Sequence, residues 1–122
     1  MDTAVIAQAQ KRLEELAGVL PRTGRVLIVP HDYPDPDALA SAAATHLLLR
    51  ERFHIHGQIV FTGEVSRAEN RELLRQCRYR WHLLDGTRPP KQKVPCIFVD
   101  TAPWSGNVTV PSFGKPVAVI DH

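Results

Sequence analysis

The sequence predicts an α/β protein with a doubly wound, mainly parallel sheet and helices on both faces. Short apolar runs alternate along the chain with segments of helical periodicity. The runs are apolar throughout rather than at every second position, which is typical of strands buried on both faces. The length of 122 residues suffices for one domain, and 43% hydrophobic with 23% charged residues is an ordinary soluble composition.

Apolar periodicity and start signals predict three helices. Apolar residues recur at spacings of three and four before Gly18, which is a suitable stop. Asp35 is a good N-cap residue, with Pro36 at the first helical position. Ser66 followed three residues later by Glu69 completes a capping box. The predicted helices cover residues 3–17, 36–52 and 67–77.

Apolar runs between polar, glycine or proline positions predict the strands. Prolines and glycines interrupt residues 102–115, so an irregular segment is expected there. Trp81, Trp104 and Phe113 are expected to be packing residues rather than base-stacking platforms. The predicted strands cover residues 25–30, 56–61, 79–84, 96–99 and 117–120.

Several protein classes do not fit this sequence. No apolar run approaches the roughly 18 residues that span a bilayer, and polar residues break the first apolar stretch, unlike a signal peptide. Cys77 and Cys96 lack metal-type spacing and are interpreted as reduced thiols. We therefore expect a cytoplasmic protein with no membrane partner.

Positive charge gathers in one segment, although the net charge is only +2. Residues 64–93 carry eight basic and four acidic side chains. Such a segment suits a phosphate-bearing small molecule or a short single-stranded nucleic acid. The alternative is a solvated helix face and loop, and the sequence leaves both open.

Metal-ligating residue types follow three of the predicted strands. The first strand leads into His31, Asp35 and Asp37, a later one into Asp100, and the last into residues 121–122 (Asp-His). In parallel α/β sheets, ligands bind in the crevice outside the carboxyl ends of the strands. Carboxylates gathered there would repel one another unless cations were present. Carboxylate and imidazole ligands without cysteine suit Mn²⁺, and a pair of such ions activates water and neutralises a phosphoryl group.

The order of these groups resembles the DHH superfamily of phosphoesterases. Residues 31–41 read His-x-x-Pro-Asp-x-Asp-Ala-x-x-Ser, which resembles the first motif of that family. Residues 99–101 (Val-Asp-Thr) resemble the second motif, and residues 119–122 (Val-Ile-Asp-His) the start of the motif that names the family. The first motif is fairly specific alone, and the ordered set covers nearly the whole chain.

The resemblance implies a site with two Mn²⁺ ions, with Mg²⁺ or Co²⁺ as substitutes. It implies that His31 and Asp35 bind one ion. It implies that Asp37 and His122 bind the other and that Asp100 bridges both. Asp37, Asp100 and His122 are thereby implied as the catalytic set, with metal-activated water as the nucleophile.

Further roles follow from the same resemblance. It implies that Asp121 orients the neighbouring ligands rather than binding an ion. Arg67, Asn70 and Arg71 lie in a segment similar to one in nuclease-like and pAp-phosphatase-like members. Arginines at a helix N-terminus can hold a phosphate there, and a purely structural capped helix is the alternative.

The chain also departs from the family pattern. Pro36 stands where the family usually has glycine between the two aspartates, and the sequence stops before the second histidine of the naming motif. We therefore expect residues 1–122 to be the N-terminal part of a DHH domain, without its C-terminal substrate-binding domain. Such a fragment is expected to bind metal weakly and to have little activity, and the full-length parent to be a candidate homodimer.

The expected activity is metal-dependent hydrolysis of phosphoesters in short oligonucleotides or nucleotides such as pAp, including exonuclease action. The alternative is a non-catalytic module of the same fold that binds nucleotides or single-stranded nucleic acid. A dinucleotide-binding domain fits poorly, because no G-x-G-x-x-G follows the first strand.

Overall fold

A five-stranded sheet forms the centre of the protein. The structure is a computed structural model that describes residues 2–22, 24–63, 81–83 and 92–121. Within these residues every strand pairing is parallel, and the strand order is β3-β2-β1-β4-β5. The predicted α/β class with a mainly parallel sheet is therefore confirmed. The strands are β1 (Val26–Val29), β2 (Gly57–Phe61), β3 (Trp81–Leu83), β4 (Val94–Val99) and β5 (Gly114–Ile120).

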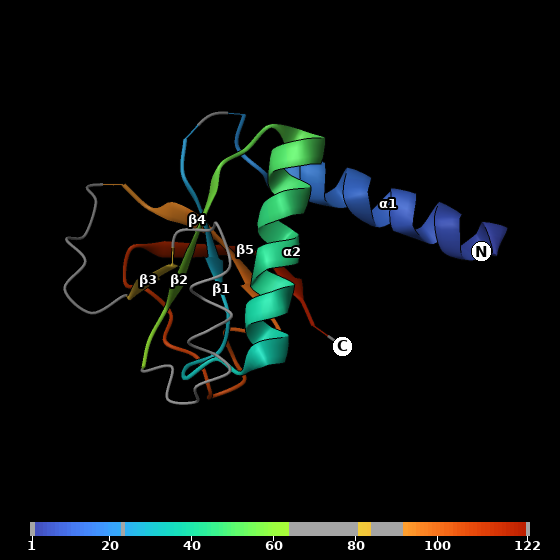
Figure 1. Cartoon of the computed structure of the whole chain (residues 1–122). Helices are drawn as coiled ribbons and strands as arrows, with labels where there is room; N and C mark the ends of the chain where they lie inside the picture. The colour runs from blue at the N-terminus through green and yellow to red at the C-terminus, as the bar shows by residue number, and fades with distance from the viewer. Residues whose placement is uncertain (1, 23, 64–80, 84–91, 122) are drawn as a thin grey trace.

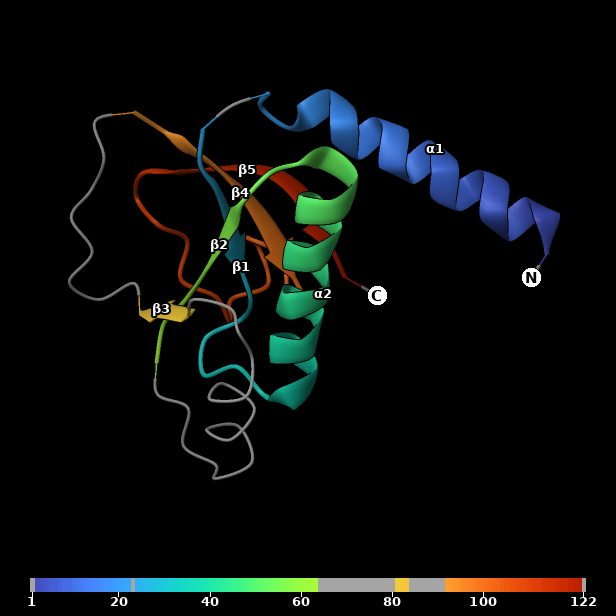
Figure 2. The ribbon, with the colours of Figure 1, turned by 45° about the horizontal axis from the view of Figure 1, so that its top comes forward.

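Two helices are described, α1 (Thr3–Val19) and α2 (Pro36–Phe53). α2 lies along the sheet, whereas α1 runs away from it (Figures 1 and 2). Leu16 of α1 packs against the same apolar cluster as α2. Both described helices thus pack on the same face of the sheet. The helix predicted over 67–77 lies outside the described residues. Neither helix is both long and apolar enough to cross a bilayer.

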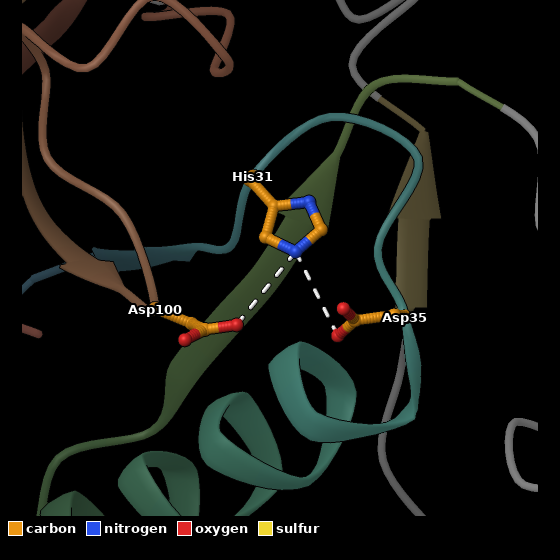
Figure 3. Close-up of side chains that lie close together, drawn as sticks. All are labelled: His31, Asp35 and Asp100. Atoms are coloured by element: carbon orange, nitrogen blue, oxygen red, sulfur yellow. Dashed lines mark ion pairs between the residues drawn. The ribbon is translucent and has the colours of Figure 1, made fainter. Parts of the chain in front are cut away.

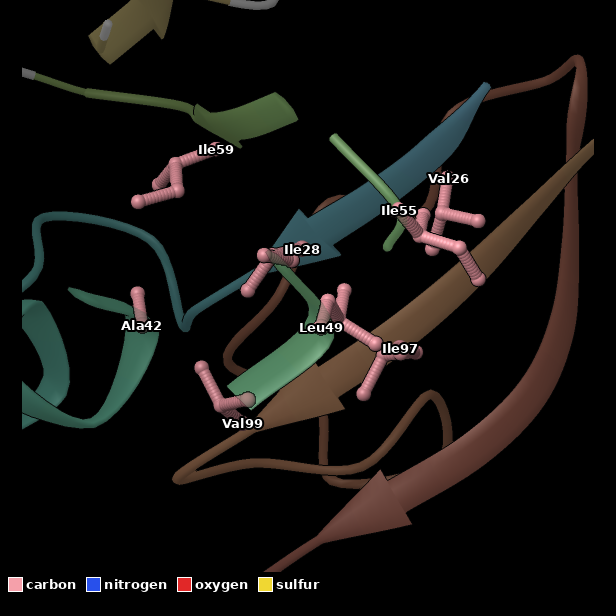
Figure 4. Packing of buried hydrophobic residues seen from close by; sticks show 8 residues of the cluster. All are labelled: Val26, Ile28, Ala42, Leu49, Ile55, Ile59, Ile97 and Val99. Atoms are coloured by element: carbon pink, nitrogen blue, oxygen red, sulfur yellow. The ribbon is translucent and has the colours of Figure 1, made fainter. Parts of the chain in front are cut away.

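The core has one layer on each face of the sheet. Successive side chains of a strand point to opposite faces, so an apolar run supplies both layers. The layer under α2 joins strand residues to Ala42 and Leu49 (Figure 4). The opposite layer packs against Val108 and Phe113 from the segment between β4 and β5. The first layer contains Val26, Ile28, Ile55, Ile59, Ile97 and Val99, and the second contains Leu27, Val29, Val60, Val94, Cys96 and Phe98.

α2 begins and ends as its sequence predicts. The Asp35 side chain accepts a hydrogen bond from the Ala38 N–H (2.8 Å), and Pro36 occupies the first turn. His54 ends the helix in the left-handed conformation (φ 56°), and the Ile55 N–H donates to the Leu49 carbonyl (2.9 Å). The helix therefore starts close to the carboxyl end of β1, beside the candidate site.

Several details differ from the sequence predictions, and one is that β4 starts at Val94 rather than at residue 96. α1 continues through Gly18 to Val19. β5 starts at Gly114 rather than at residue 117, because Gly114 already pairs with Val94. Trp104 is 80% exposed, so the prediction that it packs was wrong, whereas Phe113 does pack against the core.

Candidate metal centre

The strand order places a topological switch point between the carboxyl ends of β1 and β4. β1 pairs with β2 on one side and with β4 on the other, so the direction in which the chain adds strands reverses there. Ligands of open parallel sheets bind at such a switch point. Val29 of β1 pairs with Phe98 of β4. Two residues further along each strand, the same register brings His31 level with Asp100.

Three side chains converge at this switch point. The Nε2 atom of His31 lies 3.7 Å from Oδ1 of Asp35 and 3.7 Å from Oδ2 of Asp100 (Figure 3). One ligand atom from each residue lies within 4.8 Å of the other two. Two ligand atoms about 2.1 Å from one ion stand about 3.0–3.6 Å apart at angles of 90–120°. The two distances of 3.7 Å are close to this range, and they are too long for direct hydrogen bonds.

His31 is oriented through its other ring nitrogen. Nδ1 lies 2.8 Å from the carbonyl oxygen of Asp32. A carbonyl can only accept, so Nδ1 carries the proton and donates it. In the neutral ring the lone pair is then on Nε2, the atom that faces Asp35 and Asp100. This is the usual arrangement of a metal-binding histidine.

Asp35 combines two tasks. Its Oδ1 atom caps α2 through the Ala38 N–H, and the same oxygen lies 3.7 Å from His31 Nε2. A carboxylate oxygen has two lone pairs, so capping leaves it able to bind a cation.

Asp100 projects from a sharp turn at the end of β4. Its φ of 56° lies in the left-handed region, which aspartate tolerates better than most residues. Its N–H donates to the Ile120 carbonyl of β5 (3.0 Å). This turn ends β4 with the Asp100 carboxylate facing the His31 ring (Figure 3).

The remaining predicted site residues are placed differently. Asp37 is exposed in the first turn of α2 and is not part of the three-residue group. Asp121 is exposed and follows Ile120, the partner of Val99. Residues 67, 70, 71 and 122 (Arg, Asn, Arg and His) lie outside the described part of the chain. The second metal position and the bridging role of Asp100 stay predictions.

The sequence interpretation missed a set of anchoring residues. The Asp32 carboxylate accepts hydrogen bonds from the N–H and the hydroxyl of Thr109, both at 2.8 Å. The Asp32 N–H donates to the Asn107 carbonyl (2.8 Å), and the Thr101 hydroxyl donates to Oδ1 of Asn107 (2.6 Å). No spacing rule identifies the contacts between Asp32 and Thr109, because these residues are 77 positions apart in the sequence.

The imidazole of His46 lies on α2 and is not part of the three-residue group. Burial lowers the pKa of His46, and the charges of Arg50 and His56 lower it further. The neutral form of His46 is therefore favoured.

Comparisons of the chain with protein-family models, with curated proteins and with solved structures find no match.

Proposed function

We propose that this chain carries the metal centre of a Mn²⁺-dependent phosphoesterase of the DHH type. The observation that supports this most is the convergence of His31, Asp35 and Asp100 at the switch point of a parallel sheet. Oxygen and imidazole ligands suit Mn²⁺, and Mg²⁺ or Co²⁺ are alternatives. A bound metal pair would supply an activated water and neutralise the phosphoryl charge.

The chain's own residues provide a cluster of one imidazole and two carboxylates. His31 presents Nε2, while Asp35 and Asp100 supply the negative charge that attracts a cation. Without a cation the two carboxylates repel each other. In this proposal Asp37 and His122 serve a second ion and Asp100 bridges the two. Asp121 would then orient the ligands from the end of β5.

Exposed aromatic rings favour a substrate that carries a base. Tyr33 lies between the ligands His31 and Asp35 in sequence, is 68% exposed and has a left-handed backbone (φ 51°). Its ring lies against Gly63, where a Cβ atom would come within 2.6 Å of it. Trp104, four residues after Asp100, is 80% exposed. Such rings can stack on a nucleobase, which supports short oligonucleotides or nucleotides such as pAp as substrates.

The same aromatic rings would also serve a non-catalytic module that binds nucleotides or single-stranded nucleic acid. The two functions differ in their need for the carboxylates. Binding by such a module would not require metal and would survive Asp100→Asn. We place either form in the cytoplasm, in keeping with the thiol of Cys96, which is free and buried.

Hydrolysis assays distinguish these functions. The purified chain would be incubated with Mn²⁺ and pAp, short RNAs, a cyclic dinucleotide or pyrophosphate, with chelated samples as blanks. We expect slow Mn²⁺-dependent release of phosphate or mononucleotide that Asp100→Asn abolishes. Glu14→Gln, which removes an exposed charge from α1, is the matched control. A chain that binds pAp without metal but never hydrolyses any of these compounds would favour the non-catalytic module.

A further inference from the structure

Asp32 lies between His31 and Asp35 in the sequence, yet its carboxylate faces the segment between β4 and β5. Its N–H donates to the Asn107 carbonyl, and its carbonyl accepts from Nδ1 of His31, each at 2.8 Å. Its two carboxylate oxygens accept separately from the N–H and the hydroxyl of Thr109, again at 2.8 Å. This carboxylate is thus committed to the segment between β4 and β5 and does not belong to the His31–Asp35–Asp100 group.

Residues 107–109, which we call the strap, contact both halves of the candidate site. The Asn107 carbonyl and Thr109 accept from and donate to Asp32, the neighbour of His31. The Asn107 side chain accepts from the hydroxyl of Thr101, the buried neighbour of Asp100. The strap therefore ties the loop after β1 to the loop after β4.

We propose that Asp32 is the positioning residue of the metal centre and that the strap sets its geometry. Three of the hydrogen bonds fix the Asp32 peptide and side chain, so its carbonyl is held where His31 Nδ1 must donate to it. That contact selects the Nδ1–H form and leaves Nε2 facing Asp35 and Asp100. This inference rests on the proposed metal function, but it also makes a statement about His31 in the metal-free protein.

Outer contacts of this kind have measurable effects. Loss of a group that orients a metal-binding histidine typically weakens metal affinity about 10–100-fold. Asp32→Ala removes both acceptors for Thr109, so Mn²⁺ affinity is expected to fall by the full factor of about 10–100. Thr109→Val removes only the hydroxyl donor and keeps the backbone donor, so a smaller loss is expected. Thr109→Ser restores the hydroxyl and should bind Mn²⁺ like the unmodified chain.

A second threonine provides the control for simple destabilisation. The Thr45 hydroxyl, on α2, donates to the Ser41 carbonyl (2.8 Å) and Thr45 is buried. Thr45→Val therefore deletes a comparable hydrogen bond without touching the loops of the site. It should lower the melting temperature and leave Mn²⁺ affinity unchanged.

The experiment combines two readouts on the whole chain. Imidazole ¹⁵N NMR of the metal-free protein reports the His31 tautomer, with the signal assigned by its loss in His31→Gln. Mn²⁺ titration followed by EPR reports affinity. We expect an Nδ1–H His31 whose preference weakens in Asp32→Ala, together with affinity falling from the unmodified chain to Thr109→Val to Asp32→Ala.

Two results would overturn the inference. One is a His31 protonated on Nε2 in the unmodified chain. The other is Mn²⁺ binding by Asp32→Ala and Thr109→Val that equals that of the unmodified chain. If the unmodified chain binds no Mn²⁺ at all, the proposed function fails instead. The tautomer comparison then still decides whether Asp32 positions His31.

Discussion

The Nε2 atom of His31 lies 3.7 Å from Oδ2 of Asp100, across the boundary between β1 and β4. The two residues are far apart in the sequence and meet because the strands are adjacent and parallel. Val29 pairs with Phe98, and His31 and Asp100 each follow two residues later in their chains, so the strand register brings them side by side. A shift of either strand by one residue would turn its buried side chains to the other face, so the register that builds the core also aligns the ligands.

Asp35 allows its structural and metal-binding roles to be separated. Asp35→Ser keeps an oxygen that can cap α2 but removes the carboxylate, whereas Asp35→Ala removes both. Both variants should lose most Mn²⁺ affinity, measured by EPR titration. Only Asp35→Ala should also lose about 1 kcal/mol of unfolding free energy in urea, the usual value of an N-cap. Full Mn²⁺ affinity in Asp35→Ser would remove Asp35 from the ligand set.

Removing the Tyr33 ring should weaken the binding of substrates that carry a base and leave the binding of other substrates unchanged. Tyr33→Ala deletes the exposed ring, and base stacking on an aromatic ring contributes about 1–3 kcal/mol. We expect a raised KM for pAp, with hydrolysis of pyrophosphate unchanged. Tyr33→Phe keeps the ring and is the control. Equal losses on both substrates would show that the ring supports the loop rather than the base.

Gly114 is a close-packed position at the start of β5. An added Cβ would lie 2.7 Å from Sγ of Cys96 and 3.1 Å from the backbone oxygen of Pro111. Gly114→Ala should therefore destabilise the fold by about 1–3 kcal/mol, as overpacking does. Gly18→Ala is the matched control, because its Cβ would meet nothing within 4 Å and alanine favours the α1 helix. Urea unfolding that ranks Gly114→Ala as stable as Gly18→Ala would contradict the packing described.

Cys96 should resist thiol reagents in the folded protein. Burial raises its pKa to about 11, so the reactive thiolate is scarce at pH 8. In a Cys77→Ser variant, DTNB should label Cys96 only after urea is added. Because the folded state holds this proton more tightly, the stabilising contribution is present below the ordinary thiol range near pH 8.5 and is lost as pH rises toward 11. Rapid labelling without urea would contradict the burial of this side chain.

Local signals predicted the elements and their order well. The α2 start was evident because Asp35 and Pro36 are a cap and a first-turn residue whose effects need no distant partner. The apolar β1 run predicted a strand buried on both faces, and all four of its residues are buried. The carboxyl ends of parallel strands share one edge of a sheet, which is why His31, Asp35 and Asp100 could be grouped in advance although the strand order was not predicted.

Hydrogen bonds between segments far apart in the sequence could not be predicted from the sequence. Nothing in the residues around Thr109 indicates that it holds Asp32, because the contact depends on where the chain between β4 and β5 folds back. The exposure of Trp104 was missed for a related reason: a tryptophan in an irregular segment packs only if that segment turns it inward. The residue type predicted that Trp104 is buried, whereas the path of the chain leaves it exposed.

Mn²⁺ titration of the unmodified chain and Asp100→Asn, followed by EPR, tests the metal centre most directly. Asparagine accepts the left-handed backbone of residue 100 and keeps the shape of the side chain, so the variant should stay folded. We expect saturable Mn²⁺ binding by the unmodified chain and by Glu14→Gln, and at least a tenfold weaker affinity in Asp100→Asn. Equal affinity in all three proteins, or no binding by the unmodified chain, would contradict a metal site between His31, Asp35 and Asp100.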